Sequence, residues 1–339
     1  MRRKRQSGNI VLAHGDGGQL TQDLVKEVFL PYFDDPALLE QNDATSLTID
    51  TRQISVSTDS FVIQPLEFPG GDIGKLAVAG TVNDLAVSGA RPAFLTVGFV
   101  LEEGFEIETL KKFVYSMAIT AHEAGVRIVA GDTKVVERGM CGGAIINTTG
   151  IGFMEHPGKF AYRNIQAGDR IVINGGIAEH AITILATRAE LEFSPPVMSD
   201  CQVLRPVIDR VLERFATVRF MRDPTRGGIA TALKEIALLT NLDMTLQEEA
   251  IPIQSAIQGA LEVMGMDPLY LANEGKVLFI VASNEAAELV DFLRSIPGNE
   301  LACEIGHTQE GNGTLWLQTA IGGMRELGML SGTPLPRIC

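Results

Sequence analysis

Hydrophobic and polar positions follow two different periods along the first half of the chain. The pattern predicts a largely apolar, buried helix at 72–88 and an amphipathic helix at 106–124. Apolar runs of strand length occupy 54–63, 93–101, 127–136 and 141–153. We expect the third of these strands to be interrupted at Gly131-Asp132-Thr133-Lys134. Strands and helices that alternate in this way are typical of an α/β or mixed α+β domain.

The second half repeats the alternation after a polar turn at 166–169. The pattern predicts helices at 178–189, 202–216, 226–240 and 285–294, and strands at 171–174, 276–282, 301–307 and 314–318. Because 339 residues exceed what one hydrophobic core usually supports, we expect two domains. The segments that we assign are 1–47 (a glycine-rich loop and helix), 48–166 (the first domain), 167–330 (the second domain) and 331–339 (a tail).

The tail differs from the rest of the chain because it carries two prolines at alternate positions, Pro334 and Pro336. This spacing disfavours a helix and pairing within a sheet, so we expect an extended and mobile segment. Nine extended residues span about 30 Å. The tail can therefore carry its terminal thiol, Cys339, into a distant active site.

Composition and charge exclude several classes of protein. The formal net charge of −14 disfavours binding to nucleic acid through the bulk field. No apolar stretch reaches the roughly 20 residues of a membrane helix, and the basic start at 1–5 is followed by polar residues rather than by the apolar core of a signal peptide. The four cysteines form no C-x-x-C pair, which disfavours a zinc site or a disulfide framework. We expect a cytoplasmic protein.

A glycine-rich loop after His14 is the first candidate for nucleotide binding. Gly15, Gly17 and Gly18 precede a segment with helical spacing, and the backbone N–H groups of such a loop can bind a triphosphate. The loop lacks the lysine and hydroxyl residue of a Walker motif and does not match G-x-G-x-x-G. A plain turn is the alternative interpretation.

Three aspartates lie where predicted elements end or inside a predicted helix: Asp59, Asp84 and Asp132. Carboxylates from separate elements can meet around Mg²⁺, and Lys75 and Lys134 can neutralise phosphate. Asp84 lies among apolar residues, and a buried carboxylate needs a cation or strong donors nearby. Taken singly, each aspartate is equally consistent with a cap or a surface group.

Two further segments can carry chemistry. Asp223-Pro224-Thr225-Arg226 resembles a helix N-cap followed by proline at the first helical position, so the free N–H groups there can face an anion. Glu274 stands before a predicted strand at a glycine turn and can act as a general base if it is desolvated. An ordinary capped helix and a surface turn are the respective alternatives.

Together these segments resemble the HypE family of hydrogenase maturation factors, in the superfamily of aminoimidazole ribonucleotide synthetase and selenophosphate synthetase. The resemblance covers nearly the whole chain, and its most specific part is the terminal Pro336-Arg337-Ile338-Cys339. The segments that carry it are 12–18, 57–61, 68–77, 83–92, 131–136, 223–228, 273–276 and 336–339.

The resemblance implies an α+β fold of two α/β domains, in which the N-terminal sheet closes a β-barrel with a second copy in a homodimer. The C-terminal domain would form an α/β layer alongside, and ATP and Mg²⁺ would bind in the cleft. The metal side would be Asp59, Asp84 and Asp132. The phosphate side would be Gly15, Gly17, Gly18, Lys75, Asn83, Lys134 and Arg226. Glu274 would be the base, with Asp84 a metal or proton-handling partner.

The activity implied is the ATP-dependent dehydration of a carbamoyl group on Cys339 to a thiocyanate. A carbamoyltransferase, HypF, would load the thiol, and an iron-holding HypC–HypD complex would receive the product. Neither nucleic acid nor a membrane would be a partner.

Two other functions are compatible with the same fold. One is a small-molecule ATP-dependent synthetase or kinase, which the tethered terminal thiol disfavours because a free substrate needs no carrier. The other is a non-catalytic carrier of Cys339, which the group of glycines and carboxylates disfavours.

Overall fold

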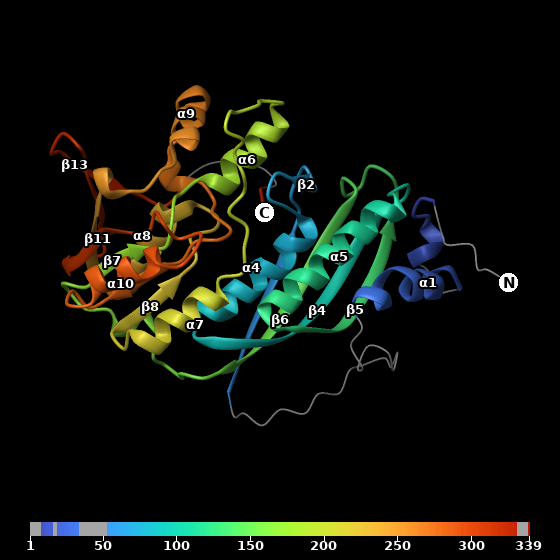
Figure 1. Ribbon diagram of the computed structural model, residues 1–339, viewed down its shortest axis with the longest axis horizontal. Coiled ribbons are helices and arrows are strands. Elements are labelled where there is room, and N and C mark those ends of the chain that lie inside the picture. The colour runs from blue at the N-terminus through green and yellow to red at the C-terminus, as the bar shows by residue number, and fades with distance from the viewer. Residues whose placement is uncertain (1–7, 16–18, 34–52, 331–337) are drawn as a thin grey trace.

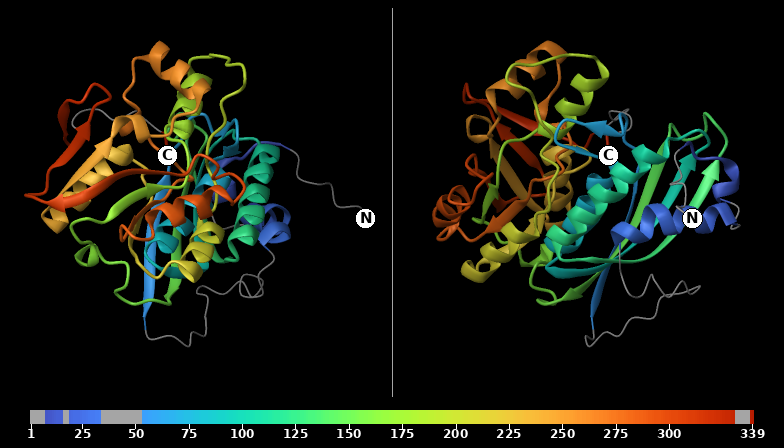
Figure 2. Two further views of the ribbon diagram at one scale, coloured as in Figure 1. Left: turned by 60° about the vertical axis from the view of Figure 1, so that its left-hand side comes forward. Right: turned by 45° about the vertical axis from the view of Figure 1, so that its right-hand side comes forward.

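The computed structural model describes residues 8–15, 19–33, 53–330 and 338–339. Gly17 and Gly18, and the tail residues 331–337, lie outside the described residues. The chain forms two α/β domains side by side, with its C-terminal end between them (Figures 1 and 2).

A four-stranded sheet forms the core of the first domain. The strand order is β1 (Ile54–Phe61), β6 (Ala144–Met154), β4 (Ala90–Glu102) and β5 (Arg127–Val136), and only the β4–β5 pair is parallel. Helices α4 (Ile73–Val87) and α5 (Ile107–Ala124) cover one face of this sheet (Figure 1). Both helices confirm the predictions at 72–88 and 106–124.

Strand β5 corrects one prediction. Gly131 to Lys134 do not interrupt the strand, because they pair in register with Val97 to Val100 of β4. β5 is one edge of the sheet and β1 is the other. On β1, Ile54 and Val56 point away from the helices and remain 46% and 59% exposed.

The N-terminal elements pack beside α5 and β5. They are η1 (Leu12–Gly15), α1 (Gln19–Leu24), η2 (Val25–Phe29) and α2 (Leu30–Phe33). The ring of Phe29 lies 4.9 Å from that of Phe99 on β4, and the Ile10 amide donates to the Phe105 carbonyl. These contacts fix the start of the glycine-rich loop, at Gly15, near the β5 edge.

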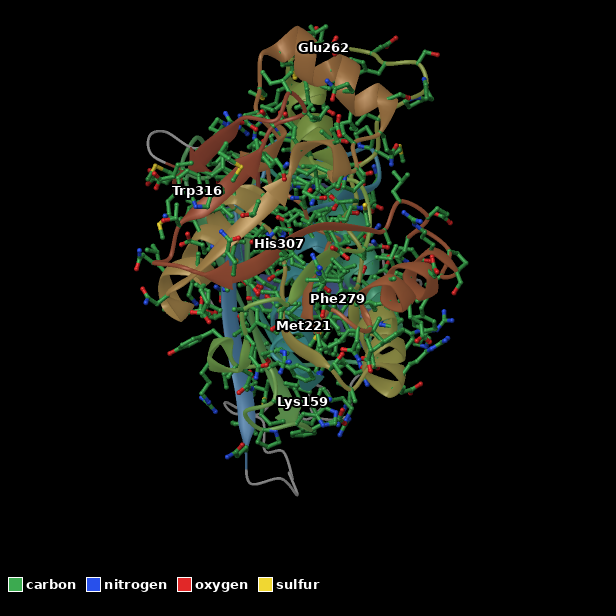
Figure 3. All side chains as sticks on the ribbon, turned by 90° about the vertical axis from the view of Figure 1, so that its left-hand side faces the viewer. Lys159, Met221, Glu262, Phe279, His307 and Trp316 are labelled. Carbon is green, nitrogen blue, oxygen red and sulfur yellow. The ribbon has the colours of Figure 1, made fainter. Side chains whose placement is uncertain are left out.

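A seven-stranded sheet forms the core of the second domain. Its strands, in spatial order, are β13 (Met324–Leu327), β12 (Leu315–Gln318), β9 (Leu242–Gln247), β11 (Cys303–Glu310), β7 (Arg170–Ile173), β10 (Leu278–Val281) and β8 (Val218–Arg222). Its helices are α6 (Glu179–Arg188), α7 (Arg205–Arg214), α8 (Gly228–Thr240), α9 (Ser255–Met264) and α10 (Ala286–Arg294). Figure 3 shows Met221 and Phe279 inside this domain, on paired positions of β8 and β10. The hydrophobic pattern did not predict β8, β9, β13 or α9.

Helix α4 joins the two domains. Almost all of its side chains are buried, and it packs against α7 and β8 of the second domain as well as against its own sheet. A short ribbon, β2 (Glu67–Phe68) and β3 (Gly71–Asp72), precedes it. Of the helices that the structure describes, none is long and apolar enough to cross a membrane.

Candidate functional site

A cavity of about 520 Å³ lies between the two domains. The first domain contributes residues of β1 and α4 to its wall, and the second contributes β8 and the segment after it. The charged and thiol groups of the wall are Arg222, which also pairs with Glu235 of α8, and six residues that we call the cleft group: Asp59, Asp84, Asp223, Arg226, Glu274 and Cys339. Four of these six residues are acidic, so the cavity concentrates negative charge.

Asp59 and Asp84 come together because β1 packs against α4. The Ser57 hydroxyl, two residues before Asp59 on the same face of β1, donates to Asp84 Oδ2 at 2.6 Å. Burial, and then the charge of Asp84, raises the pKa of Asp59 to about 6. Burial, and then the charge of Asp223, raises the pKa of Asp84. Asp84 thus makes Asp59 harder to ionise, and Asp223 does the same to Asp84, as expected of like charges held close together.

Asp223 belongs to the cleft group, although the sequence pattern predicted it to be a helix N-cap. The prediction of a helix N-cap at Asp223 is wrong, because α8 begins at Gly228 with Gly227 as its N-cap, at φ 78°. Asp223 instead follows the end of β8 and is buried beside Asp59 and Asp84, and burial raises its pKa.

Arg226 is a cation of the second domain that lies beside Asp59. Its Nη2 lies 3.9 Å from Asp59 Oδ1, and its side chain is 80% exposed. A guanidinium held this loosely contributes little to stability, but it is free to pair with an anionic ligand.

Glu274 is fully enclosed, at 4% exposure, and its Oε1 atom has no hydrogen-bond partner among the described residues. Burial, and then the charge of Asp200, raises its pKa well above the ordinary value. Its backbone is fixed from behind, because Asp200 accepts hydrogen bonds from the N–H groups of Glu274 and Gly275 at 3.2 and 3.1 Å. Lys276 compensates this charge: its Nζ lies 3.6 Å from Asp200 and 2.8 Å from Glu179.

The terminal residue, Cys339, lies in the cavity wall next to Glu274. Burial, and then the Glu274 carboxylate, raises the pKa of the thiol to about 12. The thiol is therefore protonated at neutral pH and is a poor nucleophile in this position. The structure thus brings together Cys339, Glu274 and Asp84, the three residues predicted to carry the chemistry.

Two of the predicted phosphate ligands do not line the cavity. The Lys75 ammonium donates to the Gly70 carbonyl at 2.9 Å. Asn83 is buried, and its amide donates to the Gln202 carbonyl and accepts from the Leu204 N–H at 3.0 and 2.8 Å. Asn83 therefore ties α4 to the second domain, which leaves it little capacity to bind a nucleotide.

The remaining predicted ligands, which we call the edge group, lie near the opposite edge of the first sheet: Gly15, Asp132 and Lys134. Asp132 and Lys134 form an ion pair on β5 at 3.0 Å, and both side chains are about two-thirds exposed. Three strand spacings separate β5 from β1, which is about 14 Å at roughly 4.8 Å per strand. One chain therefore does not bring the cleft group and the edge group together.

Comparison with known proteins agrees with this two-domain arrangement. Residues 34–154 match the family model "AIR synthase related protein, N-terminal domain", and residues 166–317 match its C-terminal domain. The chain is 43% identical over 333 residues to the carbamoyl dehydratase HypE of Rhodobacter capsulatus, covering 97% of this chain and 98% of that one. It is also 43% identical over 336 residues to HypE of Escherichia coli K12, covering 98% and 99%. The chain belongs to the HypE family.

Solved structures of HypE proteins have the same fold. A HypE crystal structure in complex with ATP matches with a TM-score of 0.93 at 42% identity, covering 97% of this chain and 99% of that chain. The HypE chain of a HypE–HypF complex matches with a TM-score of 0.79 at 39% identity, covering 92% and 100%. A thiamine-monophosphate kinase from Stenotrophomonas maltophilia matches at 18% identity and a TM-score of 0.64, which shows a likeness of fold alone. These matches confirm the HypE resemblance and the two-domain α/β fold.

Proposed function

We propose that this chain is an ATP-dependent carbamoyl dehydratase that converts an S-carbamoyl group on its own Cys339 into an S-cyano group. The observation that carries the proposal is the position of Cys339: the last residue of the chain lies in the interdomain cavity beside Glu274. The names of the HypE relatives and the ATP complex of a HypE chain support the same reaction. The cyano group would supply a cyanide ligand for the iron of a nickel–iron hydrogenase.

The reaction needs an activated oxygen. In the thiocarbamate R–S–C(=O)–NH₂, the carbonyl oxygen attacks the γ-phosphorus of ATP and ADP leaves. Loss of one N–H proton gives the imidate R–S–C(=NH)–O–phosphate. Loss of the second N–H proton and of inorganic phosphate gives R–S–C≡N. The sum is one carbamoyl group and one ATP converted to one thiocyanate, ADP and phosphate, and the carbamoyl oxygen ends in the phosphate.

Glu274 is the proposed base for the N–H protons. It lies against the residue that carries the group, and its Oε1 atom, which has no hydrogen-bond partner among the described residues, can accept a proton. Its raised pKa makes the ionised carboxylate a stronger base than an exposed glutamate. The protonated state of the Cys339 thiol is no obstacle, because the sulfur is already carbamoylated when the dehydration occurs.

Asp59, Asp84 and Asp223 are the proposed cation side of the site. The described residues do not form a ready-made cage of protein ligands for a metal ion. Mg²⁺ usually binds through one or two carboxylates and completes its shell with waters and phosphate oxygens. Bound Mg²⁺ would neutralise phosphate charge, and Asp59 and Asp84 would hold it, with Asp223 beside them.

The edge group gains a role in a homodimer. The exposed apolar side chains on the outer face of β1, including Ile54 and Val56, favour pairing of this sheet with that of a second copy. Such pairing would close the predicted β-barrel, and it would bring Gly15, Asp132 and Lys134 of one chain towards the cleft group of the other. We therefore keep Asp132 as a proposed Mg²⁺ ligand and Lys134 as a proposed phosphate ligand, acting across the dimer.

The partners follow from the chemistry of the tail. The thiol with a pKa of about 12 in the cavity is poorly suited to accept a carbamoyl group there, so loading occurs outside. The complex of a HypE relative with HypF supports a HypF-type carbamoyltransferase as the loading partner. A HypC–HypD-type complex is the proposed acceptor, and the cytoplasm the proposed location.

Intact mass spectrometry of the carbamoylated chain tests the proposal. We expect the C-terminal peptide to lose the mass of one water only when both ATP and Mg²⁺ are present. ATP hydrolysis with an unchanged C-terminal peptide would contradict the proposal and would favour a free small-molecule substrate.

A further inference from the structure

The end of the tail is held in the cavity by its backbone. The Ile338 carbonyl accepts a hydrogen bond from His180 Nε2 at 2.7 Å, and His180 is completely buried near the start of α6. The Ile338 side chain is itself 5% exposed and packs in the main hydrophobic core. Ile338 directly precedes Cys339, so this contact fixes the attachment point of the thiol.

The hydrogen bonds around His180 fix the direction of the ring. A carbonyl can only accept, so Nε2 carries the hydrogen that faces Ile338. Burial lowers the pKa of His180, so the ring is neutral and Nδ1 is an acceptor. The Ser199 hydroxyl donates to Nδ1 at 2.8 Å and accepts from the Cys201 N–H at 3.1 Å. The edge-on ring of Phe68, 5.5 Å away, completes the setting.

The same segments also position Glu274. Asp200, between Ser199 and Cys201, holds the backbone of Glu274, as described above. Asn273, the residue before Glu274, accepts from the Ala178 N–H at the start of α6 at 2.8 Å. His180 and Glu274 are therefore tied to one another through two short connections. When the Ile338 carbonyl is bonded to His180, Cys339 is therefore held in a fixed position relative to Glu274.

We propose that His180, oriented by Ser199, is a latch that holds the Ile338 carbonyl and so places the group on Cys339 against Glu274. This inference rests on the proposed function and makes His180 a positioning residue. The latch touches the backbone and not the sulfur. It therefore binds the thiol, carbamoyl and cyano forms of the tail alike, and the tail leaves by breaking the same contact after either step.

Alkylation of Cys339 by iodoacetamide, followed peptide by peptide in the full-length chain without ATP, tests the latch. A latched thiol is partly buried and protonated, so it is alkylated slowly, and faster alkylation reports a larger fraction of released tail. We expect about a tenfold faster alkylation in His180→Ala, since the loss of one buried hydrogen bond is of this size. Ser199→Ala, which keeps the ring, should give a smaller increase. His180→Gln should stay closer to wild type because its amide can replace the Nε2–H donor.

Two internal controls separate the latch from a general loss of structure. His122→Ala, an exposed histidine on α5, should alkylate as the wild type does, and the alkylation of Cys303 should be the same in every variant. Single-turnover dehydration of the carbamoylated chain should also slow in His180→Ala, because without the latch the group is held less well against Glu274, and ATP affinity should be unchanged. If His180→Ala does not fold, Ser199→Ala decides the matter.

Wild-type alkylation of Cys339 in a folded His180→Ala or Ser199→Ala chain would overturn the latch. Faster alkylation with unchanged dehydration would overturn its positioning role. If the wild-type chain performs no dehydration, the proposed function fails, but the alkylation rates still decide whether His180 holds the tail.

Discussion

The cleft group and the edge group contain the same kinds of residue in opposite surroundings. In the cleft group, Asp84, Asp223 and Glu274 are largely buried, and burial together with their mutual repulsion raises their pKa values. In the edge group, Asp132 and Lys134 form an exposed ion pair on a strand edge. An exposed pair of this type adds almost nothing to stability, whereas burying several acids next to one another costs free energy. The cleft group therefore favours a bound cation, whereas the side chains of the edge group are accessible from solvent.

This contrast is the reason for proposing that the two groups meet in a homodimer. The cleft group supplies the tethered substrate and the base, but of the two cations in the cavity wall Arg226 is loosely held and Arg222 is paired with Glu235. The edge group supplies a lysine and the start of a glycine loop but no reacting group. A bound triphosphate needs both the reacting groups of the cleft group and the phosphate-binding groups of the edge group, which a homodimer can bring together.

The largest effect is expected at the terminal thiol. Cys339→Ser should fold and bind ATP as the wild type does, but it should form no thiocyanate, because no sulfur is present to carry the group. Mass spectrometry of the C-terminal peptide measures this. Cys303→Ser, a partly buried cysteine on β11, is the matched control and should keep full activity. Product formation by Cys339→Ser would exclude the carrier role.

Replacing the proposed base should slow the reaction without unfolding the chain. We expect Glu274→Gln to reduce single-turnover dehydration about 10²–10⁴-fold, the usual contribution of a general base. Thermal stability should be unchanged or higher, because the substitution removes a buried acidic group. Glu262→Gln, on the surface of α9 (Figure 3), is the control. An equally active Glu274→Gln chain would remove Glu274 from the mechanism.

The edge group can be tested by complementation. Lys134→Ala should lower activity about 10²-fold or more, as expected for the loss of a phosphate-stabilising group. An equal mixture of Lys134→Ala and inactive Glu274→Gln chains should recover about a quarter of wild-type activity. Half of the randomly formed dimers are mixed, and each mixed dimer has one site with both Glu274 and Lys134 intact. Absence of recovery after verified subunit exchange would show that Lys134 serves its own chain or no site at all.

The smallest effect concerns pH and stability. The pKa of Asp59 is about 6 in the folded chain and near 3.8 ordinarily, so the folded chain binds this proton more tightly. The stability due to protonated Asp59 is therefore complete at low pH and decreases as the pH rises from about 4 to about 6. Asp59→Asn should remove this decrease.

Asp59 is partly exposed, and solvent screening reduces the effect to about 2 °C in the difference between the melting temperatures at pH 5 and pH 7. Asp132→Asn, in the exposed edge group, should leave that difference unchanged. If the difference is the same in wild type and Asp59→Asn, the pKa of Asp59 is not raised in the folded chain.

The sequence pattern predicted elements and residues where the signal is local. The long helices α4 and α5 follow from hydrophobic spacing, and Cys339, Glu274, Asp59 and Asp84 stand in segments that resemble the HypE family. Asp223 shows the limit. Its neighbour Pro224 resembles the first residue of a helix, but the packing of β8 against α4 carries Asp223 into the cavity instead.

Other features depend on contacts that are distant along the chain. His180 belongs to no motif, and its proposed role rests on its hydrogen bond to the Ile338 carbonyl, 158 residues further along the chain. Asn83 stands next to Asp84 in sequence, yet on a helix it points to the segment at 202–204 and joins the domains. Strand β5 overrides its local glycine–aspartate signal because β4 pairs with it along its length.

The fate of the carbamoyl oxygen tests the central claim most directly. A chain carrying an isotopically labelled oxygen in the Cys339 carbamoyl group is mixed with unlabelled ATP and Mg²⁺ in unlabelled water, and the released inorganic phosphate is analysed by mass spectrometry. If the carbamoyl group is activated by phosphorylation, each phosphate formed with a thiocyanate carries one labelled oxygen. Thiocyanate formed together with unlabelled phosphate would contradict the account.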